Sequence, residues 1–131
     1  MKRDKYDAVV SDVIREAAGR CECCNRTGRL ECAHVYGRRH HNTRWDLQNL
    51  LSLCHGCHRK FTECPAVFMD WCAANLGCGH MEQLREKHHQ IKKWKQWEKD
   101  EMYQHYKKEL ARVREIRATG DFYPIDVVSY Q

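Results

Sequence analysis

Two pairs of cysteines constrain this sequence more than any other feature. Cys21 and Cys24 form one Cys-x2-Cys pair, and Cys54 and Cys57 form a second. Together they offer four thiolates, the ligand set of a tetrahedral structural zinc site. We therefore expect a zinc ion that joins the segment near residue 21 to the segment near residue 57, and closes the insert between them.

The remaining cysteines agree better with a metal site than with disulfides. The chain has nine cysteines in 131 residues, an odd number that does not suit a complete disulfide framework. Its first residues are charged and lack the apolar core of a signal peptide, so we expect an intracellular protein in which paired cysteines bind metal. Cys23 is an alternative member of the first pair, at poorer spacing. The others are expected to be small buried residues: Cys32, Cys64, Cys72 and Cys78.

The charge balance favours a polyanionic partner. Lys and Arg number 23 against 18 Asp and Glu, a formal net charge of +5. This mild excess of positive charge favours binding to nucleic acid, and it is much smaller than the net charge of a disordered basic tail. No segment is apolar over the length that a bilayer requires, so we expect no membrane partner and a cytoplasmic location.

Hydrophobic periodicity predicts an α+β protein with three regions. Residues 1–19 contain a short amphipathic helix, with Asp4 placed to cap it and Gly19 placed to end it. Residues 20–76 break that period and predict two short strands, a long loop, a helix and a further helix that begins at Pro65. Residues 77–131 form a helical extension and tail.

The extension has an imperfect apolar stripe that leaves two structures open. Residues 81–119 contain neither glycine nor proline, which predicts one long helix or two helices with a bend. The stripe would pack back on the domain or on a second copy of the chain, as a homodimer through the long helix.

Between the two cysteine pairs lies a run of residues that resembles a known family. The chain reads Leu-Glu-Cys-Ala-His-Val at 30–35, Thr-Arg-Trp-Asp-Leu-Gln-Asn-Leu at 43–50, and Leu-Cys-His-Gly-Cys-His at 53–58. His34, Asn49 and His58 resemble the three residues that name the HNH motif of ββα-metal nucleases. The similarity covers residues 20–72 and is strongest to small HNH proteins of phages and bacteria. It implies a phage-encoded or bacterial protein with a ββα-metal core held together by the four-cysteine zinc site.

The resemblance implies a metal-dependent endonuclease that hydrolyses DNA phosphodiester bonds. His34 would act as general base toward water, and His58 would bind a catalytic divalent ion such as Mg²⁺, Mn²⁺, Ni²⁺ or Zn²⁺. Asn49 would brace the loop by side-chain hydrogen bonds and hold His34 in orientation.

The sequence departs from the family at two positions. Many members carry a metal-binding Asp or His directly before the base, where this chain has Ala33, and some carry a histidine where this chain has Thr62. The catalytic ion therefore lacks expected ligands. Spacing does not choose among four substitutes: His40, His41, Asp46 and Glu63.

Basic residues around the motif are expected to contact DNA phosphates, because guanidinium groups match phosphate oxygens with two donors. These candidates are Arg38, Arg39, Arg44, Arg59 and Lys60. Arg44 stands out among them by its motif position beside Trp45, which is itself expected to be a core or loop anchor.

Two other functions compete with hydrolysis. A zinc module that binds nucleic acid without cleaving it would explain Ala33. A redox or zinc-storage protein would explain the nine cysteines but not His34, Asn49 and His58 at their spacing between two zinc knuckles.

Overall fold

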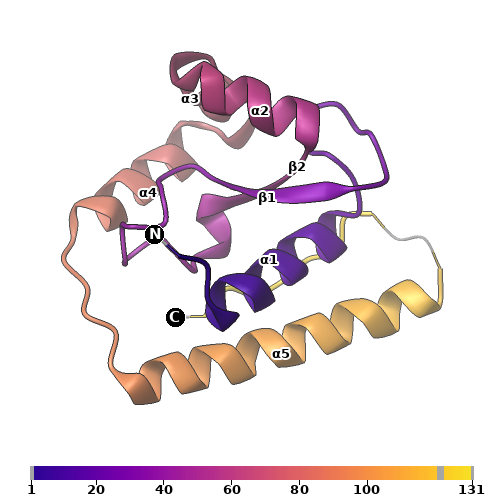
Figure 1. Cartoon of the computed structure of the whole chain (residues 1–131), viewed down its shortest axis with the longest axis vertical. Helices are drawn as coiled ribbons and strands as arrows, with labels where there is room; N and C mark the ends of the chain where they lie inside the picture. Colours follow the sequence, from indigo (N-terminus) through magenta and orange to yellow (C-terminus); the bar gives the residue numbers. More distant parts are fainter. Residues whose placement is uncertain (1, 121–122, 131) are drawn as a thin grey trace.

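The computed structural model describes residues 2–120 and 123–130 and has α+β architecture (Figure 1). Within these residues, five α-helices surround one two-stranded antiparallel sheet. The helices are α1 (Lys5–Ala18), α2 (His55–Glu63), α3 (Pro65–Leu76), α4 (Cys78–His89) and α5 (Gln96–Ala118). The strands are β1 (Leu30–His34) and β2 (Leu50–Cys54), and a 3-10 turn, η1 (Leu47–Asn49), leads into β2. The expected α+β class is confirmed.

Helix α1 begins and ends as the sequence predicts. The Asp4 side chain accepts a hydrogen bond from the backbone N–H of Asp7, and the Asp7 side chain accepts one from the N–H of Asp4. At the other end, Gly19 has φ 69° and donates its N–H to the carbonyl of Arg15. A residue without Cβ adopts this left-handed conformation at little cost, which is why glycine ends so many helices.

The β-hairpin lies between α1 and α2 (Figure 1). Its register pairs Leu30 with Cys54 at one end and His34 with Leu50 at the other. Because successive side chains alternate between faces, Ala33 points with its partner Leu51 toward the side of α2, where both are buried. Cys32 instead packs with the residues of α1. Successive residues of β1, such as Cys32 and Ala33, therefore face opposite sides of the hairpin.

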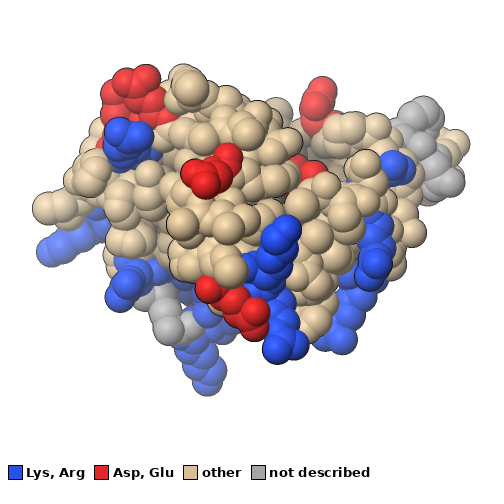
Figure 2. All heavy atoms as spheres, turned by 90° about the horizontal axis from the view of Figure 1, so that it is seen from above, with Lys and Arg blue, Asp and Glu red and all other residues tan. Residues whose placement is uncertain are grey.

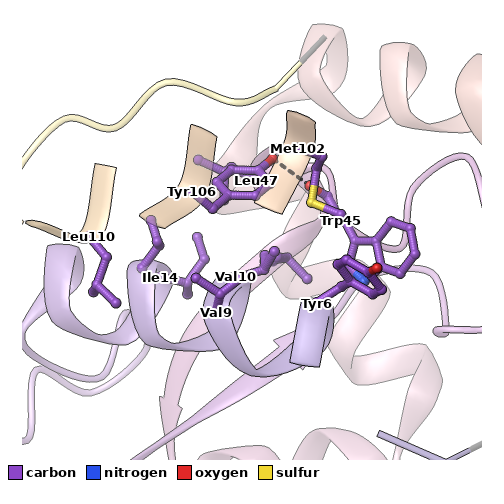
Figure 3. Packing of buried hydrophobic residues seen from close by; sticks show 11 residues of the cluster. Tyr6, Val9, Val10, Ile14, Trp45, Leu47, Met102, Tyr106 and Leu110 are labelled. Atoms are coloured by element: carbon purple, nitrogen blue, oxygen red, sulfur yellow. Dashed lines mark hydrogen bonds between the residues drawn. The ribbon is translucent and has the colours of Figure 1, made fainter. Parts of the chain in front are cut away.

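The longest helix, α5, packs along α1. Figure 3 shows side chains of both helices interleaved in one hydrophobic cluster, with Tyr106 and Leu110 of α5 against Val9 and Ile14 of α1. The Tyr106 hydroxyl is fully buried and donates a 2.6 Å hydrogen bond to the carbonyl of Trp45. The part of the predicted apolar stripe that lies on α5 is therefore covered within the chain, whereas Ile91, before α5, is exposed. A homodimer through this helix stays a prediction.

The predicted helical segment 81–119 is divided. Helix α4 ends at His89, α5 begins at Gln96, and the residues between them belong to no helix or strand. Of the two structures that the sequence left open, the two-helix form is the observed one. No helix in the described part of the chain has the length and apolar character needed to cross a membrane.

A buried ion pair joins α1 to the loop between the strands. Asp7 accepts hydrogen bonds from Arg44 at 2.6 and 2.9 Å and from the Trp45 indole at 2.9 Å. Burial acts to raise the pKa of Asp7, but the bonds from Arg44, the Asp4 N–H and Trp45 outweigh it, and the pKa lies well below its usual value. Arg44 itself is only 6% exposed, and most of its guanidinium is used inside the protein. The expectation that Arg44 contacts DNA stays a prediction.

This pair predicts a large stability effect. Asp7→Asn should lower the free energy of unfolding by about 3 kcal/mol, because it leaves the buried Arg44 charge with only the exposed Asp4 carboxylate, 3.3 Å away, as a counter-ion. Asp12→Asn, on the same helix, breaks only the more exposed pair with Arg15 and should cost less than about 1 kcal/mol. Urea unfolding of both variants measures the difference, and equal effects would contradict the role given to Asp7.

Candidate metal centre and active-site cleft

Four cysteine sulfurs converge at the base of the hairpin. The Sγ atoms of Cys21, Cys24, Cys54 and Cys57 all lie within 4.8 Å of one another, and those of Cys24 and Cys54 are 3.7 Å apart. Zinc–sulfur bonds of about 2.3 Å in a tetrahedron place sulfurs about 3.8 Å apart, so the cluster fits such an ion. The predicted convergence of these four cysteines is confirmed, and they lie close enough together to hold a metal ion such as zinc. Cys23 lies outside the set.

Local structure explains how the two pairs meet. The first pair lies in a turn after α1, where Cys21 donates its N–H to the carbonyl of Arg26 and accepts from the N–H of Asn25. In the second pair, Cys54 is the last residue of β2 and caps α2, and its sulfur accepts the N–H of Cys57 at 3.5 Å. A strand end and a tight turn therefore position all four sulfurs without long flexible segments.

The cluster is electrostatically suited to a cation. Burial acts to raise the pKa of the Cys21 thiol, but the backbone N–H groups of Cys54, Cys24 and Cys23 outweigh it and lower the pKa to about 7. Burial and the neighbouring sulfurs raise the pKa of Cys57 instead. A negatively charged thiolate disfavours the ionisation of a second thiol beside it. A bound cation would offset this repulsion and stabilise all four cysteines as thiolates.

The cluster predicts one tightly bound metal ion per chain. Cys24→Ser and Cys57→Ser should lose this ion and lower the Tm by about 10 °C or more, since binding is coupled to folding. Cys64→Ser and Cys78→Ser are matched controls, because both residues lie outside the cluster and are exposed, contrary to the burial expected from sequence. These two control variants should keep both the bound ion and the Tm of the wild type. Elemental analysis and thermal unfolding measure both, and retention of the ion and of the Tm in the cluster variants would refute the assignment.

His34 is the last residue of β1 and lines an open cleft of about 1230 Å³. Burial lowers its pKa to about 4, and the positive charge of Arg38 acts in the same direction. The imidazole is consequently neutral at neutral pH and is not protonated until the pH falls to about 4. A neutral ring nitrogen is free to accept a proton.

Asn49 braces the loop that follows His34. Its side chain is fully buried, accepts the N–H of Tyr36 at 2.8 Å, and donates to the carbonyls of Tyr36 and Thr43 at 2.9 and 3.0 Å. Its backbone carbonyl accepts the N–H of Val35 at 2.9 Å. All of these contacts hold backbone next to His34, so Asn49 is placed to position the histidine through the chain.

Glu31 joins the site and was missed by the sequence reasoning. Its carboxylate oxygens lie 2.8 Å from Nδ1 of His58 and 3.0 Å from Nδ1 of His55. The hydrogen bond with His58 makes the largest contribution, followed by that with His55, and together they lower the pKa of the Glu31 carboxylate below its usual value. Strand alternation places Glu31 on the same face of β1 as Ala33, and this was the available signal.

The four substitutes considered from the sequence lie elsewhere. Asp46 caps η1 and pairs with Lys87 at 2.7 Å, while Glu63 pairs with Arg59 at 3.0 Å. The ring of His40 packs on those of Tyr36 and His88. The carbonyl of His41 accepts the Trp94 indole N–H, and none of these four lines the cleft.

His34, Glu31 and His58 all line this cleft. By strand alternation, Glu31 comes from the face of β1 that is turned toward α2, and His34 from the opposite face. Of the basic residues predicted to contact DNA, Arg38 lines this cleft and Arg44 contributes to its wall from a buried position. Arg39, Arg59 and Lys60 are outside it. Five further arginines also line the cleft: Arg3, Arg15, Arg29, Arg114 and Arg117.

No protein-family model, curated protein or solved structure matches this chain. The functional assignment therefore rests on the residues of the chain and on their arrangement.

Proposed function

We propose that this protein is an HNH-type endonuclease that uses a divalent metal ion to hydrolyse phosphodiester bonds in DNA. One observation carries the proposal: a neutral histidine, His34, and a carboxylate–histidine pair, Glu31 and His58, line one cleft whose remaining charged residues are mostly arginines. Phosphodiester hydrolysis needs a proton acceptor for water, stabilisation of the developing oxyanion, and groups that hold the phosphate. The cleft offers side chains for each.

The order of elements supports assignment to the ββα-metal fold. A hairpin of β1 and β2 runs directly into α2, with His34 at the end of β1, Asn49 just before β2 and His58 in α2. These are the positions that the motif resemblance implies. The four-cysteine cluster lies at the other end of the hairpin, where it would hold the hairpin to α2 as a structural zinc site, because four thiolates suit zinc better than Mg²⁺ or Mn²⁺.

In this mechanism His34 accepts a proton from the attacking water. With a pKa of about 4, it is in the required neutral form at neutral pH but is a weak base toward ordinary water. It is effective only toward a water whose own pKa has been lowered. Asn49 keeps the backbone beside His34 in place during this transfer.

Glu31 and His58 are the residues that would hold the catalytic ion. Their facing atoms share a 2.8 Å hydrogen bond, so an ion bound by both atoms would have to replace the proton between them. Mg²⁺, Mn²⁺, Ni²⁺ or Zn²⁺ bound there would acidify water and neutralise charge on the leaving oxygen. Water molecules and the substrate phosphate would complete the coordination shell of the ion. They would take the place of the ligand that many family members carry at the position of Ala33.

A non-catalytic role in nucleic-acid binding is the second candidate. Ala33 is favoured by packing, because it is 2% exposed in a hydrophobic cluster with Leu51 and Phe61. If Glu31 served only to hold His58 and His55 in place, the cleft would bind DNA and leave it intact. Binding without turnover in every divalent ion would support this candidate.

The two histidines should differ in their response to metal. His34→Ala should lose about two to four orders of magnitude in turnover at every ion concentration, because added metal does not replace a proton acceptor. His58→Ala and Glu31→Gln should lose activity that returns partly as divalent ion is raised, because their defect is in metal affinity. Metal titrations of DNA cleavage measure this difference.

His41→Ala is the matched control, since His41 is exposed and outside the cleft. It should cleave as the wild type does. Bound structural metal and folding are checked first in all four variants. Full activity of His34→Ala would refute the proposed mechanism.

A further inference from the structure

Nearly all of the excess positive charge of the protein lines one cleft. The walls described above include seven arginines and three carboxylates, those of Asp7, Glu16 and Glu31, a formal excess of four positive charges. The excess for the whole chain is five. No lysine among the described residues contributes to these walls. A guanidinium binds phosphate oxygens through paired donors, so this composition favours a phosphate-rich ligand over a general counter-ion cloud.

These arginines come from elements far apart in sequence. Arg29 precedes β1, Arg15 lies on α1, and Arg114 and Arg117 lie in the last turns of α5. Arg114 donates to both oxygens of Glu16 at 2.8 and 2.9 Å, and Arg117 donates to the carbonyl of Glu16 at 2.6 Å. A guanidinium has five N–H donors. A carboxylate that accepts two of these hydrogen bonds holds the guanidinium in orientation and leaves the other donors for a phosphate.

The lining favours the backbone of a duplex over a single strand. Sites for single-stranded nucleic acid stack bases on exposed aromatic rings. Trp45 is the one Phe, Tyr or Trp among the described residues that line the cleft, and it is 3% exposed with its indole N–H bound to Asp7. Seen from the side of α2 and α3, Lys and Arg are most numerous along the lower edge of the molecule, with others toward its left and right ends and some Asp and Glu between them (Figure 2). Arginines that offer phosphate contacts, without exposed rings on which bases could stack, suit the backbone of a duplex.

We propose that this cleft binds the phosphate backbone of double-stranded DNA along α1 and the C-terminal end of α5, so that α5 is part of the substrate-binding surface. The inference deepens the proposed function and rests on it for the position of the cleavage site near His34. It assigns the extension a role beyond covering α1. Arg29 and Arg114 hold the DNA on either side of α1, and neither touches the reacting bond.

The test measures binding separately from cleavage. A fluorescent duplex of about 30 base pairs, longer than the footprint of a small domain, is titrated by anisotropy at a series of KCl concentrations. The protein carries His34→Ala so that the DNA stays intact. Arg29→Gln/Arg114→Gln removes two positive charges from the cleft. Lys107→Gln/Lys108→Gln removes two from exposed positions of the same helix that do not line it. Circular dichroism confirms folding of each protein.

The cleft variant should raise the Kd at about 0.1 M salt by about ten- to sixty-fold and reduce the slope of log K against log salt by about two. The α5 control should change the Kd less than about threefold, since screened charges away from the DNA contribute little. Equal effects of the two variants, or an unchanged Kd in the cleft variant, would overturn the inference.

Other outcomes separate this inference from the proposed function. Tighter binding to a single strand of the same length than to the duplex would overturn the inference and leave the nuclease proposal standing. Loss of duplex binding in the cleft variant, together with a wild type that never cleaves, would support the inference and remove the nuclease proposal.

Discussion

The convergence of four cysteine sulfurs is the constraint on which the rest of the structure depends. Cys21 follows shortly after the end of α1, and Cys54 both ends β2 and caps α2. Holding these sulfurs within 4.8 Å ties the turn after α1 to the end of the hairpin and the start of α2. The hairpin has two strands, too few to be stable alone in water. A metal ion bound by these sulfurs would add folding stability that the small apolar core alone does not provide.

Buried polar groups set the position of the loop that this cluster encloses. Asp7 holds Arg44 and Trp45 from α1, and Asn49 holds the backbone at Tyr36 and Thr43. Each group has its hydrogen bonds satisfied within the protein, so removal of one partner leaves the other buried and unpaired. These contacts place His34 at the cleft through packing and backbone geometry.

Local patterns predicted what local forces determine. The caps at Asp4 and Gly19, the helix beginning at Pro65 and the cysteine pairs each depend on residues a few positions apart, and the structure has them where the sequence indicated. Features that need long-range register were missed. Glu31 meets His58 across 27 residues, and Arg44 meets Asp7 across 37. A motif position beside Trp45 gave no sign that Arg44 would be neutralised inside the protein.

The extension shows the same limit of sequence reasoning. Its apolar stripe predicted a buried face but not whether that face meets α1 or a second chain, because the stripe is the same in both cases. Its arginines lie on a mixed-charge helix and resemble a solvated surface. They belong to the cleft only because α1 and α5 pack together and bring Arg114 to Glu16, 98 residues away in sequence.

Incubation with supercoiled plasmid tests the central claim most directly. Wild-type protein with its structural metal in place is mixed with the plasmid in Mg²⁺, Mn²⁺ or Ni²⁺, and the products are separated on a gel. We expect conversion to nicked or linear DNA in at least one of these ions and none in chelator. DNA that stays supercoiled in every ion, with folded protein bound to it, would contradict the claim that this cleft is a nuclease active site.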